Sequence, residues 1–201
     1  MSLTAVALNC SLKPSGGEAS STDRLIDELT AALGEHDVSC GPTIRLADLN
    51  IKPGVTSDEG DDDDWPQVRR QILDADILVL GTPIWLGHPS SVTQRVLERL
   101  DAFLGETDEQ GRMISWDRVA IVGVVGNEDG AHHVAAEVFQ GLNDVGFTIP
   151  ASGMTYWVGE AMHGLDYKDR GTAEKTDKAT RAAAANAAHL ARLLRAGYPR
   201  S

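Results

Sequence analysis

Short apolar segments alternate with amphipathic segments along most of this 201-residue chain, and this alternation limits its possible folds more than any other feature. Two of the apolar segments, 77–80 and 119–125, are continuous runs that are too short for helices and typical of strands covered on both faces. Weaker strand signals occur at 3–8, 38–46 and 147–149. The sequence therefore predicts five strands.

The segments between these strands show the spacing of amphipathic helices. In the first of them, Leu25, Ile26, Leu29 and Leu33 recur at helical intervals, and Gly34 is placed to end the helix. Further helices are predicted at about 65–74, 91–104, 134–142 and 172–196. Because parallel neighbouring strands need crossover connections, we expect one α/β domain over residues 1–201, with a parallel sheet between two layers of helices.

Charge and hydropathy exclude several classes of partner. The formal net charge is -12 and no stripe of Lys or Arg offsets it locally, so nucleic acid and anionic membranes are not expected partners. No apolar run approaches the length of a membrane span, and the N-terminus lacks the pattern of a secretory signal, so we expect a cytoplasmic protein. The acidic run at 58–64 is interpreted as a solvated loop.

The sequence does not predict a metal site. Only two cysteines occur, Cys10 and Cys40, far apart and without metal-ligand spacing. His132 and His133 are adjacent, so their side chains diverge on a helix, and no third ligand follows at a suitable spacing. We interpret this pair as residues at the start of a helix.

Ligands of an open α/β sheet bind beyond the carboxyl ends of its strands, which directs attention to three loops. The first loop offers hydroxyls, flexible glycines, one cation and the amino end of a helix, a set of groups that suits a phosphate. Its candidate ligands are Ser11, Lys13, Ser20, Ser21 and Thr22. The loop contains neither GxxxxGK[ST] nor GxGxxG, which disfavours nucleoside triphosphates and dinucleotides. A solvated loop with a Ser or Thr helix cap is the alternative.

The second and third loops contain the features of a binding surface for a flat ligand. Residues 82–87 combine a stiff proline, an aromatic side chain and a glycine; they are Thr82, Pro83, Ile84, Trp85, Leu86 and Gly87. Residues 126–130 place glycines at both ends of a polar segment, which permits close approach of backbone to a ligand; they are Gly126, Asn127, Glu128, Asp129 and Gly130. A core or subunit-contact role for Trp85 is the alternative.

Over roughly residues 3–149, these loops resemble the NADPH-dependent FMN reductase family of the flavodoxin-like superfamily. The likeness is most specific in TPIWLGHPSSVTQRVLERLD and looser in NCSLKPSGGEASSTDRLI. The resemblance implies a flavodoxin-like three-layer α/β/α sandwich with a five-stranded parallel sheet in the order 2-1-3-4-5. It also implies that the first loop holds the FMN phosphate and that the other two loops border the isoalloxazine ring.

The implied activity is transfer of electrons from NADPH or NADH through bound FMN to a small acceptor such as a quinone or a flavin. The cofactor would carry the chemistry, so no dedicated catalytic residue is predicted. A flavodoxin-type electron carrier without substrate turnover is the alternative, and a scaffold that has lost its ligand is a third. By the same resemblance we expect a homodimer or homotetramer. Residues 151–171 are interpreted as an irregular segment, whose aromatic and flexible residues, among them Tyr156, Trp157, Met162 and His163, predict a lid or subunit contact.

Overall fold

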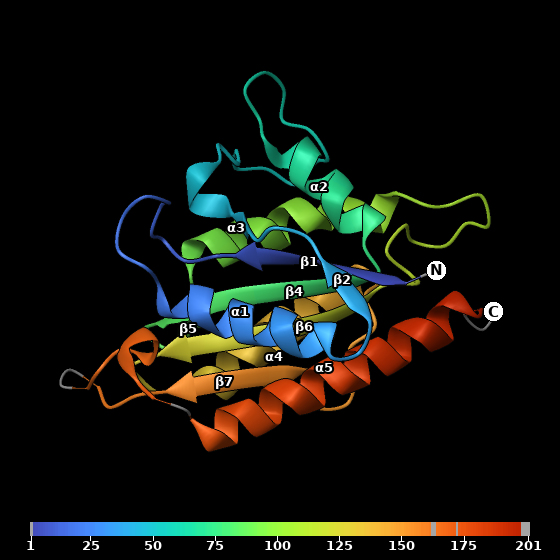
Figure 1. Ribbon diagram of the computed structural model, residues 1–201. Coiled ribbons are helices and arrows are strands. Elements are labelled where there is room, and N and C mark those ends of the chain that lie inside the picture. The colour runs from blue at the N-terminus through green and yellow to red at the C-terminus, as the bar shows by residue number, and fades with distance from the viewer. Residues whose placement is uncertain (1, 162–163, 172, 198–201) are drawn as a thin grey trace.

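The computed structural model describes residues 2–161, 164–171 and 173–197, and its main feature is a twisted sheet (Figure 1). The sheet path runs in the order β2-β1-β4-β6-β7, and every pairing along this path is parallel. These strands are β1 (Leu3–Asn9), β2 (Val38–Cys40), β4 (Ile77–Trp85), β6 (Val119–Gly126) and β7 (Met154–Val158). When these five strands are numbered by their order along the chain, their order in the sheet is 2-1-3-4-5, so the predicted order is confirmed.

Two short strands bring the total in the described residues to seven rather than the five predicted. β3 (Ile44–Arg45) pairs with the carboxyl end of β1, and β5 (His88–Pro89) pairs with the end of β4. The β4–β5 pairing is antiparallel, so the sheet is not purely parallel. The region predicted as one weak strand at 38–46 is therefore split into β2 and β3. The second predicted loop, at residues 82–87, is part of a hairpin.

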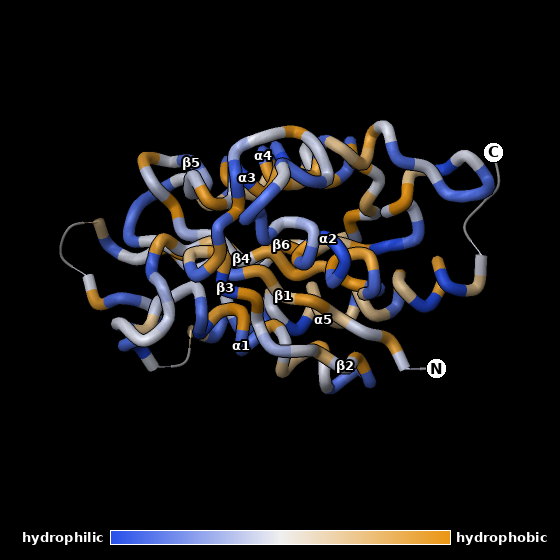
Figure 2. Tube along the Cα trace, turned by 90° about the horizontal axis from the view of Figure 1, so that it is seen from above, coloured by the Kyte–Doolittle hydropathy of each residue, from blue (hydrophilic) through white to orange (hydrophobic). Residues whose placement is uncertain are grey.

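Helices cover both faces of the sheet. α1 (Ser21–Gly34) and α5 (Glu174–Arg195) lie on one face, and α2 (Trp65–Asp74), α3 (Ser91–Leu100) and α4 (Ala131–Asp144) lie on the other (Figures 1 and 2). The helix predicted at 91–104 is divided, because the chain tightens into a 3-10 helix at Asp101–Gly105. Two further 3-10 helices occupy Leu46–Asp48 and Tyr167–Asp169.

The core explains why the central strands are continuous apolar runs. Ile77 and Val79 of β4 pack toward α1 and α5, whereas Leu78 and Leu80 pack toward α3 and α4. Successive side chains of a strand point to opposite faces, so a strand covered on both faces buries every residue. Figure 2 shows the apolar colour concentrated along these strands. At Gly81 a Cβ atom would lie 2.5 Å from Ile26 Cδ1, so the glycine lets α1 sit close to the sheet.

The predicted strand at 147–149 is wrong. Phe147 is buried in the core, but this segment makes only one isolated bridge, between Thr148 and Val119. The fifth strand is β7, in the segment predicted to be irregular. Its inward residue Thr155 is polar, and its hydroxyl is satisfied by the Thr180 hydroxyl at 2.9 Å and by a carbonyl of α5. A polar side chain at a buried position hides the apolar alternation by which a strand is recognised.

The acidic run at 58–64 is not simply a solvated loop. The Asp63 side chain is fully buried and accepts a hydrogen bond from Arg99 Nη2 at 2.8 Å. Arg99 is also buried and donates to the carbonyls of Lys52 and Thr56. Burial alone would raise the pKa of Asp63, but the hydrogen bonds from Arg99 and from three backbone N–H groups lower this pKa to about 2. This ion pair ties the loop to α3.

None of the helices in the described part of the chain combines the length and the apolar character that crossing a bilayer requires.

Candidate functional site

A cavity of about 410 Å³ lies at the carboxyl ends of β1, β4, β6 and β7. Its wall is made of three loops that follow strands and of the end of the sheet itself. The lining residues are Ser11, Leu12, Lys13, Ser20, Ser21, Thr22, Pro83, Ile84, Trp85, Val125, Gly126, Asn127, Glu128, Trp157, Gly164 and Asp166. The cavity thus lies where a ligand of an open α/β sheet is expected, and its volume is in the usual range for small-molecule sites.

One end of the cavity is rich in hydroxyl groups and meets the amino end of α1. Ser20 is the N-cap: its Oγ accepts a hydrogen bond from Asp23 N at 3.1 Å, and its own N–H donates to Asp23 Oδ2 at 3.0 Å. This capping box occupies the Ser20 hydroxyl. Ser11 and Thr22 are buried beside it and line the same end.

The acidic residues near this end are neutralised by their neighbours. Asp23 accepts hydrogen bonds from Asn9 Nδ2 at 2.6 Å and from Arg45. Burial alone would raise the pKa of Asp23, but Arg45 and the Ser20 backbone lower it. An anion at the start of α1 would therefore meet hydroxyls and backbone dipoles without facing an unpaired carboxylate.

The cation predicted in the first loop is shared. Lys13 Nζ lies 3.1 Å from Glu18, and Lys168 Nζ, from the segment after β7, lies 2.7 Å from the other oxygen of the same carboxylate. Hydrogen bonds from Lys168 and Lys13 lower the pKa of Glu18 to about 2. Both ammonium groups therefore lie near the hydroxyl-rich end, held by one carboxylate.

The other end of the cavity is lined mainly by apolar side chains, and the β4–β5 hairpin forms part of it. Pro83, Ile84 and Trp85 reach the cavity because β4 continues beyond the sheet core. Leu86 and Gly87 form the two-residue turn and both have positive φ, 53° and 78°. A turn of this kind matches the twist of a hairpin, but leucine is rarely found in it, so the hairpin was not predicted from the sequence.

The third loop holds this hairpin in place. Glu128 Oε1 accepts a hydrogen bond from Gly87 N at 3.0 Å. A Cβ atom on Gly130 would lie 2.8 Å from Gly87 Cα, and Gly130 has a φ of 118° that favours glycine. The second and third loops are thus packed backbone to backbone, so Gly130 is used for contact between the loops, whereas the sequence predicted close approach to a ligand.

Sequence reasoning missed several lining residues, of which Trp157 is the largest. It lies on β7, with its ring centroid 5.2 Å from that of Tyr167. Asp166, just before the last 3-10 helix, accepts a hydrogen bond from Asn127 Nδ2 at 2.8 Å. A signal for Trp157 was present in the β-branched and aromatic residues of MTYWV, which favour a strand even though Thr155 hides the apolar alternation. Leu12, Val125 and Gly164 were also missed.

The structure brings together eleven of the sixteen predicted binding residues, and five lie outside the cavity lining: Thr82, Leu86, Gly87, Asp129 and Gly130. Thr82 is fully buried behind the wall, where its hydroxyl accepts a hydrogen bond from Thr93 Oγ1 at 2.7 Å. Leu86 is 90% exposed at the hairpin tip. Contact of any of the sixteen with a cofactor stays a prediction. Met162 and His163 of the predicted lid lie outside the described residues.

Two polar atoms in the cavity wall point to a ligand. Ser11 Oγ and Asn127 Oδ1 are buried and have no hydrogen-bond partner among the described residues. Ser11 lies at the hydroxyl-rich end and Asn127 in the loop that follows β6. Buried polar atoms are nearly always paired, so both fit a molecule that accepts a hydrogen bond at one end and donates one near the other. A phosphorylated flat heterocycle with polar edges meets this requirement.

The described residues that line the cavity include no cysteine. Cys10, directly after β1, is buried, and burial raises the pKa of its thiol to about 12, so the thiol stays protonated. A lining of this kind suits a bound group that carries its own chemistry.

The fold and this cavity define a class: flavodoxin-like flavoproteins, which bind a phosphorylated flavin at this edge of the sheet. The model of the NADPH-dependent FMN reductase family matches residues 3–163. The chain belongs to this family. It is accordingly a flavin oxidoreductase of a family whose members use FMN and NADPH.

Two relatives and one solved structure match nearly the whole chain. The 8-demethyl-8-aminoriboflavin-5'-phosphate synthase of Streptomyces davaonensis is 32% identical over 206 residues, which is 96% of this chain and 79% of that protein. The structure of RosB with a bound 8-demethyl-8-formylriboflavin-5'-phosphate intermediate has a TM-score of 0.86 at 32% identity, covering 96% of this chain and 81% of that one. The divalent metal cation transporter MntH of Mycobacterium bovis is 39% identical over 202 residues. This chain covers only 29% of the transporter's length.

Proposed function

We propose that the protein passes electrons from NADPH or NADH through FMN to a small acceptor such as a quinone or a free flavin. The observation that carries this proposal is the shape and polarity of one continuous cavity. Its hydroxyl-rich end meets the start of α1, and its apolar lining includes the tryptophans Trp85 and Trp157. A molecule with a phosphate at one end and a flat ring at the other is complementary to both.

Within this proposal, each end of the cavity has its own residues. Ser11 and Thr22 donate hydrogen bonds to the phosphate, with Lys13 adding positive charge, whereas Ser20 is committed to the helix cap. Asn127 accepts a hydrogen bond from the edge of the ring through its unpaired Oδ1. Pro83, Ile84, Trp85 and Trp157 pack against the ring and exclude water from one of its faces.

The FMN ring supplies the hydride chemistry when it is bound, and the chain supplies position. Asp166 and Glu128 hold the loop that carries Asn127, by hydrogen bonds to Asn127 Nδ2 and to Gly87 N. Trp85 is 54% exposed, so the hairpin side of the cavity is open to a nicotinamide or an acceptor. An open face suits alternating reaction with two small molecules at the same ring.

A measurement of turnover distinguishes this reductase from the alternative, a flavodoxin-type electron carrier. FMN-loaded protein is mixed with NADPH or NADH and a quinone, and oxidation of the nicotinamide is followed against a control with the same amount of free FMN. We expect many turnovers per protein with at least one nicotinamide. A single reduction of the flavin without continued turnover would support the carrier and contradict the reductase.

A second candidate is an enzyme that modifies a flavin phosphate rather than keeping it as a resident cofactor. The relative from Streptomyces davaonensis, named as the synthase of a modified riboflavin 5'-phosphate, favours it because the match spans 96% of this chain. Mass spectrometry of FMN recovered after incubation with the protein tests this. Unchanged FMN mass after turnover supports the reductase, and a changed mass supports the modifying enzyme.

Association of subunits also stays a proposal. Exposed apolar side chains gather on the hairpin and on β7, beside the cavity: Trp85, Leu86, Tyr156 and Val158. Such a surface is suited to a second copy of the chain. Light scattering on the purified protein is expected to give a mass of at least two chains. A cytoplasmic location likewise stays a prediction.

A further inference from the structure

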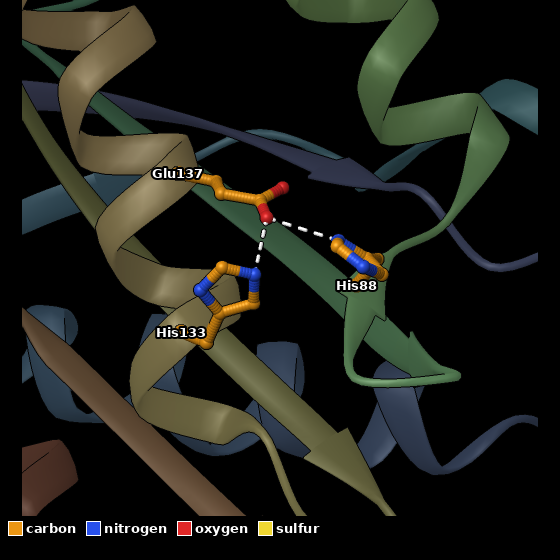
Figure 3. A group of neighbouring side chains, drawn as sticks. All are labelled: His88, His133 and Glu137. Atoms are coloured by element: carbon orange, nitrogen blue, oxygen red, sulfur yellow. Dashed lines mark hydrogen bonds and ion pairs between the residues drawn. The ribbon is translucent and has the colours of Figure 1, made fainter.

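Three metal-ligating side chains converge on the surface beside the hairpin. His133 and Glu137 are one turn apart on α4, and His88 lies on β5, 45 residues before His133 in the sequence (Figure 3). Glu137 Oε1 lies 2.6 Å from His133 Nε2 and 3.0 Å from His88 Nδ1. The three ligand atoms all lie within 4.8 Å of one another.

From this geometry we propose that His88, His133 and Glu137 form a binding site for a divalent transition-metal ion, of which Zn²⁺ is the best match. Two imidazoles and one carboxylate are a ligand set that zinc takes, with the fourth position left for water. Neighbouring ligand atoms of a tetrahedral zinc ion lie about 3.3 Å apart, as follows from its bond lengths. The two spacings to Glu137, 2.6 and 3.0 Å, are slightly shorter than this value, and the two histidine nitrogens lie within 4.8 Å of each other, so rotations of these side chains would complete the site.

The geometry of α4 places two of the three protein ligands together. Residues four apart lie on the same side of a helix, so His133 and Glu137 face the same point. His132 points elsewhere, because its ring lies 5.0 Å from that of Tyr156 on β7. The two adjacent histidines diverge, as the sequence predicted, but His133 meets two partners that their pairing did not suggest: Glu137 on the same helix and His88 on the hairpin, whose position the sequence did not reveal.

The hairpin is held firmly enough to serve as a ligand platform. Its turn residue Gly87 donates a hydrogen bond to Glu128 and packs against Gly130. His88 is paired directly across the hairpin with Trp85. A metal ion at this site would thus tie the strand that carries Trp85 to α4, outside the cavity itself. The site stands whether or not the proposed function is correct.

Ion pairing between Glu137 and protonated histidines is the alternative explanation of this cluster, and zinc titration separates the two. Untagged protein is treated with a chelator, dialysed, and titrated with zinc chloride in a calorimeter at neutral pH. We expect one ion per chain with a Kd of about 1 µM or tighter. The variants His88→Ala, His133→Ala and Glu137→Gln are each expected to weaken binding at least about tenfold.

His132→Ala is the matched control, because it removes a neighbouring exposed histidine that faces β7. Its zinc affinity should equal that of the unaltered protein. Zinc should also raise the Tm of the unaltered protein and of His132→Ala but not of the other three variants, since a ligand that binds only the folded state stabilises it. Binding weaker than about 100 µM, or equal binding by all variants, would overturn the proposal.

Discussion

Replacement of Asp63 by Asn should destabilise the protein strongly, because it leaves the buried Arg99 guanidinium without its counter-charge. Both side chains have no exposed surface, and their atoms lie 2.8 Å apart. Breaking a buried ion pair by removing one partner costs about 3–5 kcal/mol. For a domain of this size each kcal/mol lowers Tm by roughly 2–4 °C, so we expect a fall of roughly 6–20 °C.

Urea unfolding measures the free energy, and an exposed ion pair provides the control. Asp177 pairs with Arg181 on α5, where about half of each side chain is exposed. Asp177→Asn should cost less than about 1 kcal/mol. The double variant Asp63→Asn with Arg99→Met should be less destabilised than the sum of the single variants by about 1–3 kcal/mol. The reasoning would be refuted if the destabilisation of the double variant equalled the sum of the two single variants within about 0.5 kcal/mol. It would also be refuted if Asp63→Asn and Asp177→Asn lowered the free energy of unfolding equally.

The same pair predicts a dependence on pH. The pKa of Asp63 is lowered from 3.8 to about 2 in the folded protein, so the unfolded chain takes up a proton at this group first on acidification. Its contribution to stability is complete above about pH 4 and is lost as the pH falls toward 2. The stability difference between the unaltered protein and Asp63→Asn should shrink over this range. A constant difference would contradict the assigned pKa.

Three further substitutions test the cavity and its hairpin. Ser11→Ala should weaken FMN binding about tenfold and leave riboflavin binding unchanged in a fluorescence titration, because one hydrogen bond to phosphate is lost; equal losses for both ligands would contradict this. Gly130→Ala should lower the free energy of unfolding by about 1–3 kcal/mol, because Gly130 has a positive φ and its added Cβ would meet Gly87. Gly105→Ala, where a Cβ meets nothing, should lower it by less than about 1 kcal/mol, and equal urea midpoints for the two variants would contradict the packing. Leu86→Asn should raise stability by about 1 kcal/mol by relieving a left-handed leucine, and a lower urea midpoint would count against it.

The central layer of the fold was predictable because burial on both faces leaves its mark on every residue. Strands such as 77–80 and 119–125 have no polar position to confuse the pattern. β7 was missed for the opposite reason: Thr155 is buried but polar, and its partners on α5 are more than 20 residues away. Residues 147–149 were wrongly assigned to a strand, because a buried aromatic side chain such as Phe147 indicates the core but does not distinguish a strand from a loop.

The position of the candidate site could be predicted from the sequence, but the contacts between the loops that form it could not. Glycines and hydroxyls marked the three loops, since the carboxyl ends of parallel strands meet at one edge. The hairpin could not be foreseen, because its turn places a leucine at positive φ. The convergence of His88 with α4 was missed with it. Trp157 was missed for a different reason, because it lies on the unpredicted strand β7. Asp63 was likewise misread because its partner Arg99 is 36 residues away.

The account depends most on the claim that one cavity holds a phosphate at the α1 end and a flavin ring at the tryptophan end. Titration of flavin-free protein with FMN and, separately, with riboflavin tests this directly, because the two ligands differ only in the phosphate. With two or more hydrogen bonds from this end to the phosphate, we predict FMN binding at least about 100-fold tighter than riboflavin, with one FMN per chain. Equal affinities, or no saturable binding of either ligand, would contradict the account.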